Sequence, residues 1–136
     1  MIVERMVILV TAVGVCLAMV ALWRLYQQRR LAELAGQAAP EPVAALVNSG
    51  PALLYFTTPD CAQCRYQQAP ILKQFTNAIG LPVHTVNALE QTDLARHYGI
   101  MTVPSTIMLD QQRRPVAINH GLAPLQKLRE QAALVA

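Results

Sequence analysis

The 136-residue chain is poor in charge, in aromatic side chains and in cysteine. Charged residues make up 14% of it and aromatic residues 5%. The formal net charge is +3, and the basic side chains are scattered, with short pairs at Arg29-Arg30 and Arg113-Arg114 but no longer run. A surface that follows a phosphate backbone needs a denser basic patch. We therefore expect no nucleic-acid partner.

Three cysteines are too few for a small fold held together by several disulfides. Cys16 lies in an apolar N-terminal stretch, whereas Cys61 and Cys64 form a C-x-x-C motif. Only the last two can act as a local pair. We interpret Cys16 as a small apolar residue of a helix.

The N-terminal segment has no charged residue from Met6 to Trp23. As a helix this segment would be about 27 Å long, close to the hydrocarbon thickness of a bilayer. Trp23 and Tyr26 occupy the place of an interfacial aromatic belt, and two arginines follow them. We therefore predict a single transmembrane anchor in residues 1–28. A cleaved signal sequence is the alternative, but its apolar core is ordinarily shorter and is followed by small residues.

The rest of the chain divides into a linker and one domain. Residues 29–42 are polar and alanine-rich and end in two prolines, which is typical of a linker. Residues 43–136 alternate between helical and strand-like patterns, which predicts an α/β domain with helices on both faces of a sheet. The predicted strands are Ala52 to Thr57, Pro82 to Val86, Thr106 to Leu109 and Pro115 to Ile118. The predicted helices are Val43 to Asn48, Cys61 to Ile79, Thr92 to Tyr98 and Pro124 to Val135. The first two strands should be parallel and the last two antiparallel.

The C-x-x-C motif lies after an apolar strand and a short turn, at the start of a predicted helix. The free N–H groups and the dipole at a helix start favour a thiolate, which is the nucleophile of disulfide exchange. Cys61 is the better placed and is the predicted attacking thiol. Cys64, three residues on, lies on the same side of the helix and can resolve a mixed disulfide.

A structural zinc site is the competing interpretation of the motif. Such a site needs two further ligands. The chain has no second C-x-x-C, and its three histidines, His84, His97 and His120, are dispersed. We therefore expect neither a metal nor an organic cofactor, and a zinc-stabilised structural domain stays as an alternative.

Several further motifs follow the cysteines in a fixed order. They are APIL at 69–72, YGI at 98–100, VPST at 103–106 and Gly121 before the last helix. With the strand ALLYF and the C-x-x-C, this set resembles the thioredoxin family from about Val43 to the end of the chain. The resemblance implies a thioredoxin-like fold with a central four-stranded mixed sheet flanked by helices, here preceded by the transmembrane helix. It also implies that Pro104 is the cis-proline of the family and that Val103 and Pro104 bind an extended substrate segment.

The chain departs from the pattern of plain thioredoxins at several positions. Asp60 precedes the first cysteine, and an acid there would disfavour its thiolate. The interval from Cys64 to Pro70 is one residue longer than in plain thioredoxins. Tyr55 stands where the family has a buried acid, and Thr85 where it has an associated lysine. The acid-assisted proton transfer of that family is therefore not carried over.

Together these patterns predict a monomeric, membrane-anchored thiol–disulfide oxidoreductase. Its partners would be protein or small-molecule disulfides and a thiol electron donor, with reduction the preferred direction. A membrane-attached binding or assembly module with the same fold is a second alternative. Arg5 precedes the apolar segment, and three arginines, Arg24, Arg29 and Arg30, follow it. Because basic residues favour the cytoplasmic side, this imbalance weakly favours a cytoplasmic domain. The resemblance to membrane-anchored family members favours the opposite face, so both faces stay open.

Overall fold

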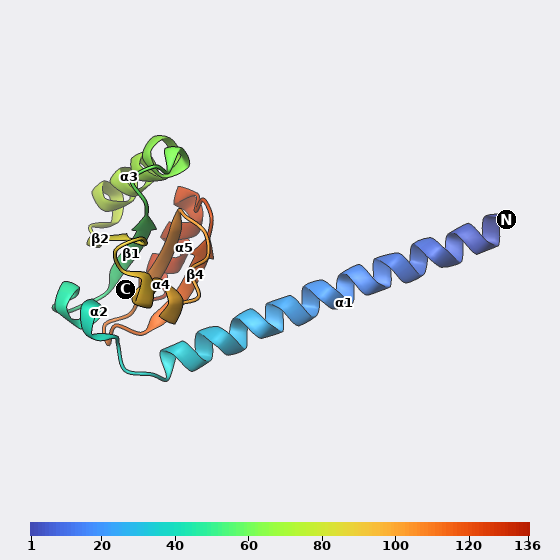
Figure 1. The fold of residues 1–136 in the computed structure, drawn as a ribbon, viewed down its shortest axis with the longest axis horizontal. Coiled ribbons are helices and arrows are strands. Elements are labelled where there is room, and N and C mark those ends of the chain that lie inside the picture. Colours follow the sequence, from blue (N-terminus) through green and yellow to red (C-terminus); the bar gives the residue numbers. More distant parts are fainter. The chain divides into compact units, whose positions relative to one another are not determined.

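A computed structural model describes residues 1–136 and divides them into two compact units, 1–33 and 34–136. Helix α1 (Ile2–Ala35) makes up nearly all of the first unit (Figure 1). It is long and apolar enough to cross a membrane, although a signal sequence meets the same description. The hydroxyl of Thr11 donates to the carbonyls of Val7 and Ile8 at 3.0 and 2.9 Å. The Thr11 hydroxyl is therefore hydrogen-bonded within the helix itself, which is the arrangement that a polar side chain surrounded by hydrocarbon requires.

Much of the polar segment 29–42 is helical. Helix α1 continues to Ala35, because the alanine, leucine and glutamate residues of this segment are good helix formers. The chain then passes Pro40 and enters α2 (Glu41–Leu46). Pro42 lies in the first turn of α2, where its missing N–H has no helical partner to lose. The short helix therefore begins earlier than the predicted Val43.

The second unit follows the predicted α-β-α-β-α-β-β-α order, with a π-helical turn at the start of its longest helix. After α2 come β1 (Ala52–Thr57), η1 (Cys64–Gln68), α3 (Ala69–Ile79), β2 (Val83–Asn87), α4 (Thr92–His97), β3 (Ser105–Leu109), β4 (Pro115–His120) and α5 (Leu125–Ala133). The bounds of β1 are those predicted. Strand β2 is shifted by one residue at both ends, and β3 and β4 are longer than predicted by one and two residues at one end.

The four strands form one mixed sheet in the order β2-β1-β3-β4. Strand β1 is parallel to β2, while β3 is antiparallel to both β1 and β4. The predicted thioredoxin-like α/β fold with a four-stranded mixed sheet is confirmed. Strand β1 is central and its residues before Thr57 are buried, so the position at which the following segment begins is well fixed.

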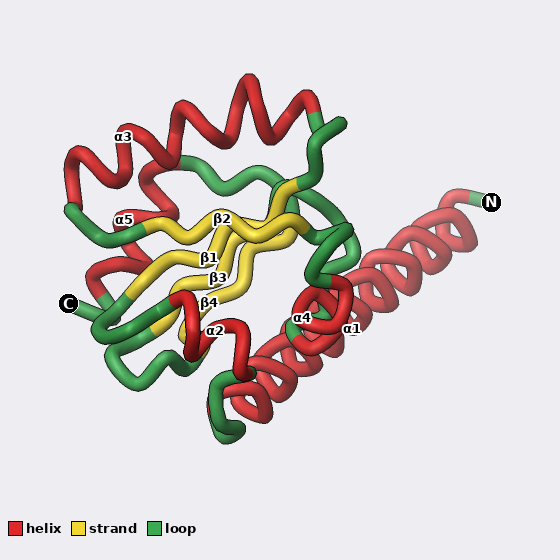
Figure 2. Tube along the Cα trace, turned by 60° about the vertical axis from the view of Figure 1, so that its left-hand side comes forward, coloured by secondary structure: helices red, strands yellow, loops and turns green.

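Helices cover both faces of this sheet (Figure 2). On one face, α2 and α4 pack against Leu54, Phe56 and Ile107. On the other face, α3 and α5 pack against Leu53, Tyr55 and Met108. The alternation of residues along β1 between the two cores is the period-2 pattern of a strand buried on both sides.

Candidate functional site

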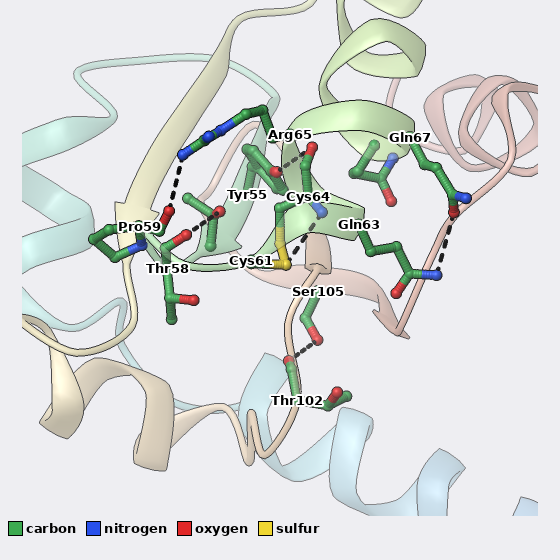
Figure 3. The surroundings of a disulfide bond; sticks show 12 residues. Tyr55, Thr58, Pro59, Cys61, Gln63, Cys64, Arg65, Gln67, Thr102 and Ser105 are labelled. Atoms are coloured by element: carbon green, nitrogen blue, oxygen red, sulfur yellow. Dashed lines mark hydrogen bonds between the residues drawn. A yellow bond between two sulfur atoms is a disulfide. The ribbon is translucent and has the colours of Figure 1, made fainter.

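A disulfide joins Cys61 and Cys64 just beyond the end of β1, with their Cα atoms 5.3 Å apart (Figure 3). Cys61 is partly exposed, whereas Cys64 is only 2% exposed. The pair is therefore asymmetric toward solvent. A reagent or a substrate meets the first sulfur before the second.

The sulfur of Cys61 takes the place of a helix cap. The backbone N–H of Cys64 donates to Cys61 Sγ at 3.1 Å, and the helical residues begin at Ala62. A serine or aspartate side chain at the cap accepts the same N–H at the start of many helices. In the reduced protein, this N–H and the helix dipole would stabilise a thiolate on Cys61.

Two charged side chains flank the turn before the pair. Asp60 is exposed. Arg65, also exposed, reaches back over the turn, and its Nη2 donates to the carbonyl of Pro59 at 3.1 Å (Figure 3). The structure therefore places a guanidinium next to the turn that carries Asp60. This positive charge opposes the effect of the acid on a Cys61 thiolate, an effect that the sequence alone left uncompensated.

The extra residue between Cys64 and Pro70 is accommodated by the π-helical turn η1. The N–H of Ala69 donates to the carbonyl of Cys64, five residues back rather than four. A single π turn adds one residue to a helix without breaking it, and such turns are frequent at functional sites. Pro70 then falls in the first turn of α3.

Tyr55 lies beneath the pair on β1. Its hydroxyl donates to the carbonyl of Cys64 at 3.2 Å, and its side chain is 6% exposed. Figure 3 shows the ring directed toward Cys64. The Cys64 carbonyl therefore accepts two hydrogen bonds, one from Ala69 within the π turn and one from Tyr55.

Gln68 ties the redox helix to a distant loop. Its Nε2 donates to the carbonyl of Ala123 at 3.1 Å, and its Oε1 accepts the N–H of Ala123 at 2.8 Å. Gln68 is fully buried and Ala123 is 1% exposed. The loop between β4 and α5 is thereby held against the helix that follows the cysteines.

The loop before β3 also lies at the disulfide. Ser105 faces Phe56 across the sheet, so the residues before Ser105 lie beside the turn after β1. Figure 3 draws Thr102 and Ser105 among the surroundings of the disulfide, and Ser105 Oγ donates to the Thr102 carbonyl at 2.7 Å. The Val103-Pro104 peptide bond is cis. The structure thus brings the four predicted site residues to one end of the sheet.

The structure offers the zinc alternative no ligand set. No group of three or more His, Cys, Asp or Glu side chains comes together in residues 1–136. The two cysteines of the motif are bonded to each other.

Sequence reasoning did not identify Arg65 and Gln68 as parts of this site. The only available signal was the extra residue before Pro70. An insertion of one residue in a helix predicts a π turn, and that turn sets which side chains of this segment face inward. Tyr55, which stands where the thioredoxin family has a buried acid, has a polar role of its own through its hydrogen bond to the Cys64 carbonyl.

Comparison with known proteins places the chain in a family. Residues 26–133 match the family described as TraF, F plasmid transfer operon protein. No curated protein matches the sequence. Among solved structures, the Schistosoma mansoni thioredoxin pre-protein has a TM-score of 0.60 at 18% identity, over 71% of this chain and 89% of that one.

Two further thioredoxin structures are similar to the same degree. Fasciola hepatica thioredoxin has a TM-score of 0.56 at 20% identity, over 65% of this chain and 83% of that one. Thioredoxin-2 of the malaria parasite, described as a component of protein secretion machinery, has a TM-score of 0.55 at 20% identity, over 64% of this chain and 82% of that one. These identities support the fold alone. The family match covers more than half of the chain, which therefore belongs to the TraF family of F plasmid transfer operon proteins and has a thioredoxin-like domain.

Proposed function

We propose that this protein is a membrane-anchored thiol–disulfide oxidoreductase in which Cys61 attacks and Cys64 resolves. One observation carries the proposal. The two sulfurs are close enough to form a disulfide at a helix start, where the outer one accepts a backbone N–H and the inner one is buried. An accessible, stabilised thiolate backed by a shielded thiol is what two-step disulfide exchange requires.

In the reducing direction the reaction has two steps. The Cys61 thiolate attacks one sulfur of a substrate disulfide, a mixed disulfide forms, and the other substrate sulfur leaves and takes up a proton. Cys64 then loses its proton and attacks Cys61 Sγ, which releases the second substrate thiol. The substrate gains two electrons and two protons. The pair is left as a disulfide, and a thiol protein must reduce it again.

We further propose that Val103 and Pro104 form one wall of the substrate site. Their loop precedes Ser105, which lies opposite the end of β1, so it runs beside the cysteine turn. Val103 packs against both cores, which fixes the backbone of this loop. An extended polypeptide with a disulfide fits such a wall, and so does a small-molecule disulfide.

Reduction of insulin by dithiothreitol in the presence of the full chain in detergent tests the activity. We expect precipitation of the insulin B chain to be accelerated by the wild-type protein. A Cys61→Ser variant should lose this acceleration. A Cys16→Ser variant is the matched control, because Cys16 lies in α1 and should not contribute. Equal rates with and without the wild-type protein would refute the proposed activity.

We also propose that residues 1–28 stay attached as a transmembrane anchor and that 43–136 form the catalytic domain. The exposed apolar side chains of α1 and the inward hydrogen bonds of Thr11 support this. The mature protein should then remain in the membrane pellet after alkaline carbonate extraction, with its original N-terminus. Labelling of Cys61 in intact cells with a membrane-impermeant thiol reagent would show which face carries the domain.

An assembly role is the second candidate, and the family description favours it. The name F plasmid transfer operon protein connects family members with a transfer system, whose components could be substrates or docking partners. A double Cys61→Ser, Cys64→Ser variant separates the two roles. If the protein acts only as a docking module, the double variant should still support transfer. If it acts as an oxidoreductase, the double variant should not.

A further inference from the structure

The two edges of the sheet are built differently. Strand β4, at one edge, begins with Pro115, and its register against β3 shifts next to that proline. Prolines and bulges are among the features that keep an edge strand from pairing with another chain. Strand β2, at the other edge (Figure 2), contains no proline and pairs with β1 in a regular register along its whole length. The edge of β2 is therefore open to a further strand.

Every second residue of β2 turns its backbone groups away from the sheet. On the inner side, the carbonyl of Pro82 accepts the N–H of Leu53 at 2.9 Å, which sets the alternation along the strand. The N–H and carbonyl groups of Val83 and Thr85 therefore point outward. Neither residue has a backbone hydrogen bond to another part of the chain on that side, and Thr85 is exposed. These are the groups with which an added strand pairs.

A groove lies beside these outward groups, between β2 and α3. It has a volume of about 230 Å³, and Val83 and Thr85 are among the residues that line it. Because side chains alternate along a strand, an extended chain paired with β2 would direct every second side chain toward this face of the sheet. Pockets for small-molecule ligands have volumes of about 300 to 1,000 Å³. The groove therefore suits a single side chain better than a whole ligand.

The groove carries a positive charge and no acid. Lys73 lines it from α3, is exposed, and has no ion pair or hydrogen-bond partner in the chain. The hydroxyl of Thr85, on the β2 side, likewise has no partner. No aspartate or glutamate occurs between Asp60 and Glu90, a segment that includes both α3 and β2. A carboxylate in the groove would meet an ammonium group and a hydroxyl donor.

We propose that the edge of β2 docks an extended segment of a partner protein, with an acidic side chain of that segment directed into the groove beside Lys73. Main-chain pairing supplies affinity, and the groove selects the acid. A second copy of this chain is a poorer occupant. An isologous pairing would set the segment between Asp60 and Glu90 against itself and offer Lys73 no carboxylate. The proposal does not depend on the redox activity, because neither cysteine takes part in the docking.

Pools of short synthetic peptides test the proposal on the full chain in detergent. Each pool has glutamate, glutamine or lysine fixed at its centre and random residues other than cysteine and proline around it, and binding is measured by fluorescence polarisation. We expect the glutamate pool to bind about twofold to fivefold more tightly than the glutamine pool, the range for an exposed ion pair, and the lysine pool to bind most weakly. Amide hydrogen exchange at Val83 and Thr85 should slow when the glutamate pool is bound.

Substitution of Lys73 tests the selection of the acid. Lys73→Gln removes the charge that lines the groove, so the glutamate and glutamine pools should then bind equally. The matched control is Lys127→Gln, which removes the only other lysine of the chain from an exposed position on α5. It should leave the preference for glutamate unchanged. Equal loss of the preference in both variants would show a general effect of net charge and overturn the assignment of the groove.

Substitution of Thr85 tests the main-chain pairing. Thr85→Pro removes an outward N–H that makes no bond within the sheet, so it should weaken the glutamate pool by about tenfold or more. Thr85→Val keeps this N–H and should bind the glutamine pool as the wild type does. If Thr85→Pro does not fold, Lys73→Gln and the exchange data still decide.

The outcomes that would overturn the proposal are distinct. Equal binding of the three pools to the wild type, or unchanged amide exchange at Val83 and Thr85, would show that the edge does not dock an acidic strand. Concentration-dependent dimers of the wild type that disappear in Thr85→Pro would show that a second copy occupies the edge instead. Insulin reduction by the wild type tests the proposed function separately, and its result does not bear on the docking site.

Discussion

The side-chain amide of Gln68 is hydrogen-bonded to both backbone polar groups of Ala123, 55 residues further along the chain. An amide has one donor side and one acceptor side, so it can pair with a peptide unit as a neighbouring strand would. Both partners are buried, and water cannot replace either bond. This pairing holds the loop after β4 against the helix that carries Cys64.

Replacement of Gln68 by leucine should destabilise the domain. It leaves the N–H and the carbonyl of Ala123 buried without partners, and each such group costs about 1 to 3 kcal/mol. We expect the free energy of unfolding to fall by roughly 2 to 4 kcal/mol, measured by urea titration of the domain's near-ultraviolet circular dichroism. Gln67→Leu is the control, because Gln67 is exposed, and it should change stability by less than about 0.5 kcal/mol. Equal stability of the two variants would contradict the role of the pairing.

The charges around the cysteine turn should act in opposite directions on Cys61. Arg65→Gln removes the guanidinium that binds the Pro59 carbonyl, and Asp60→Asn removes the neighbouring negative charge. Two charges about 4 Å apart in water interact by about 1 kcal/mol, so each variant should change the thiolate fraction about twofold to fivefold. We expect Arg65→Gln to slow iodoacetamide alkylation of Cys61 at neutral pH and Asp60→Asn to accelerate it.

The salt dependence of these rates provides the check. Both side chains are exposed, so 1 M salt should reduce both effects, since the Debye length falls to about 3 Å. Effects of the same sign, or effects insensitive to salt, would show that the substitutions change the geometry of the turn instead.

Tyr98 should make the domain sensitive to alkali. Burial raises its pKa from 10.0 to about 12. In the unfolded chain the phenol ionises near its ordinary pKa of 10.0, whereas in the folded domain it stays neutral up to about pH 12. As the pH rises through this window the unfolded chain loses the proton first, so the free energy of unfolding falls. We expect Tyr98→Phe to flatten the fall in stability across this window, because phenylalanine does not ionise and keeps the edge-to-face contact with Phe56. Tyr66→Phe, at an exposed position, should leave the fall unchanged.

The elements of the domain could be predicted because each has a local cause. Strand β1 has a continuous apolar run, and Gly80 and Gly99 end helical patterns with the positive φ angles that glycine adopts easily. The direction of the strands followed from the length of their connections. Such features depend on residues close together in the sequence.

The polar contacts of the site could not be predicted in the same way. The bond between Gln68 and Ala123 depends on the phase of the helix after the π turn and on the path of a loop far along the chain. The bond from Tyr55 to Cys64 depends on how deeply the helix sits on the sheet. The extra residue before Pro70 was visible, but its consequence for helix phase was not.

The asymmetry of the two cysteines gives the most direct prediction about roles. Cys61 is partly exposed and accepts the Cys64 N–H, whereas Cys64 is buried behind it. In a Cys64→Ser variant, Cys61 can still attack a substrate disulfide, but nothing resolves the product. We expect this variant to accumulate mixed disulfides that appear on non-reducing gels and vanish on reduction. With Cys16 replaced by alanine in both variants, Cys61→Ser should accumulate few, because its one remaining thiol, Cys64, is buried. Limiting alkylation of the reduced wild type should likewise modify Cys61 first, and faster modification of Cys64, or trapping by Cys61→Ser alone, would reverse the assignment of attacker and resolver.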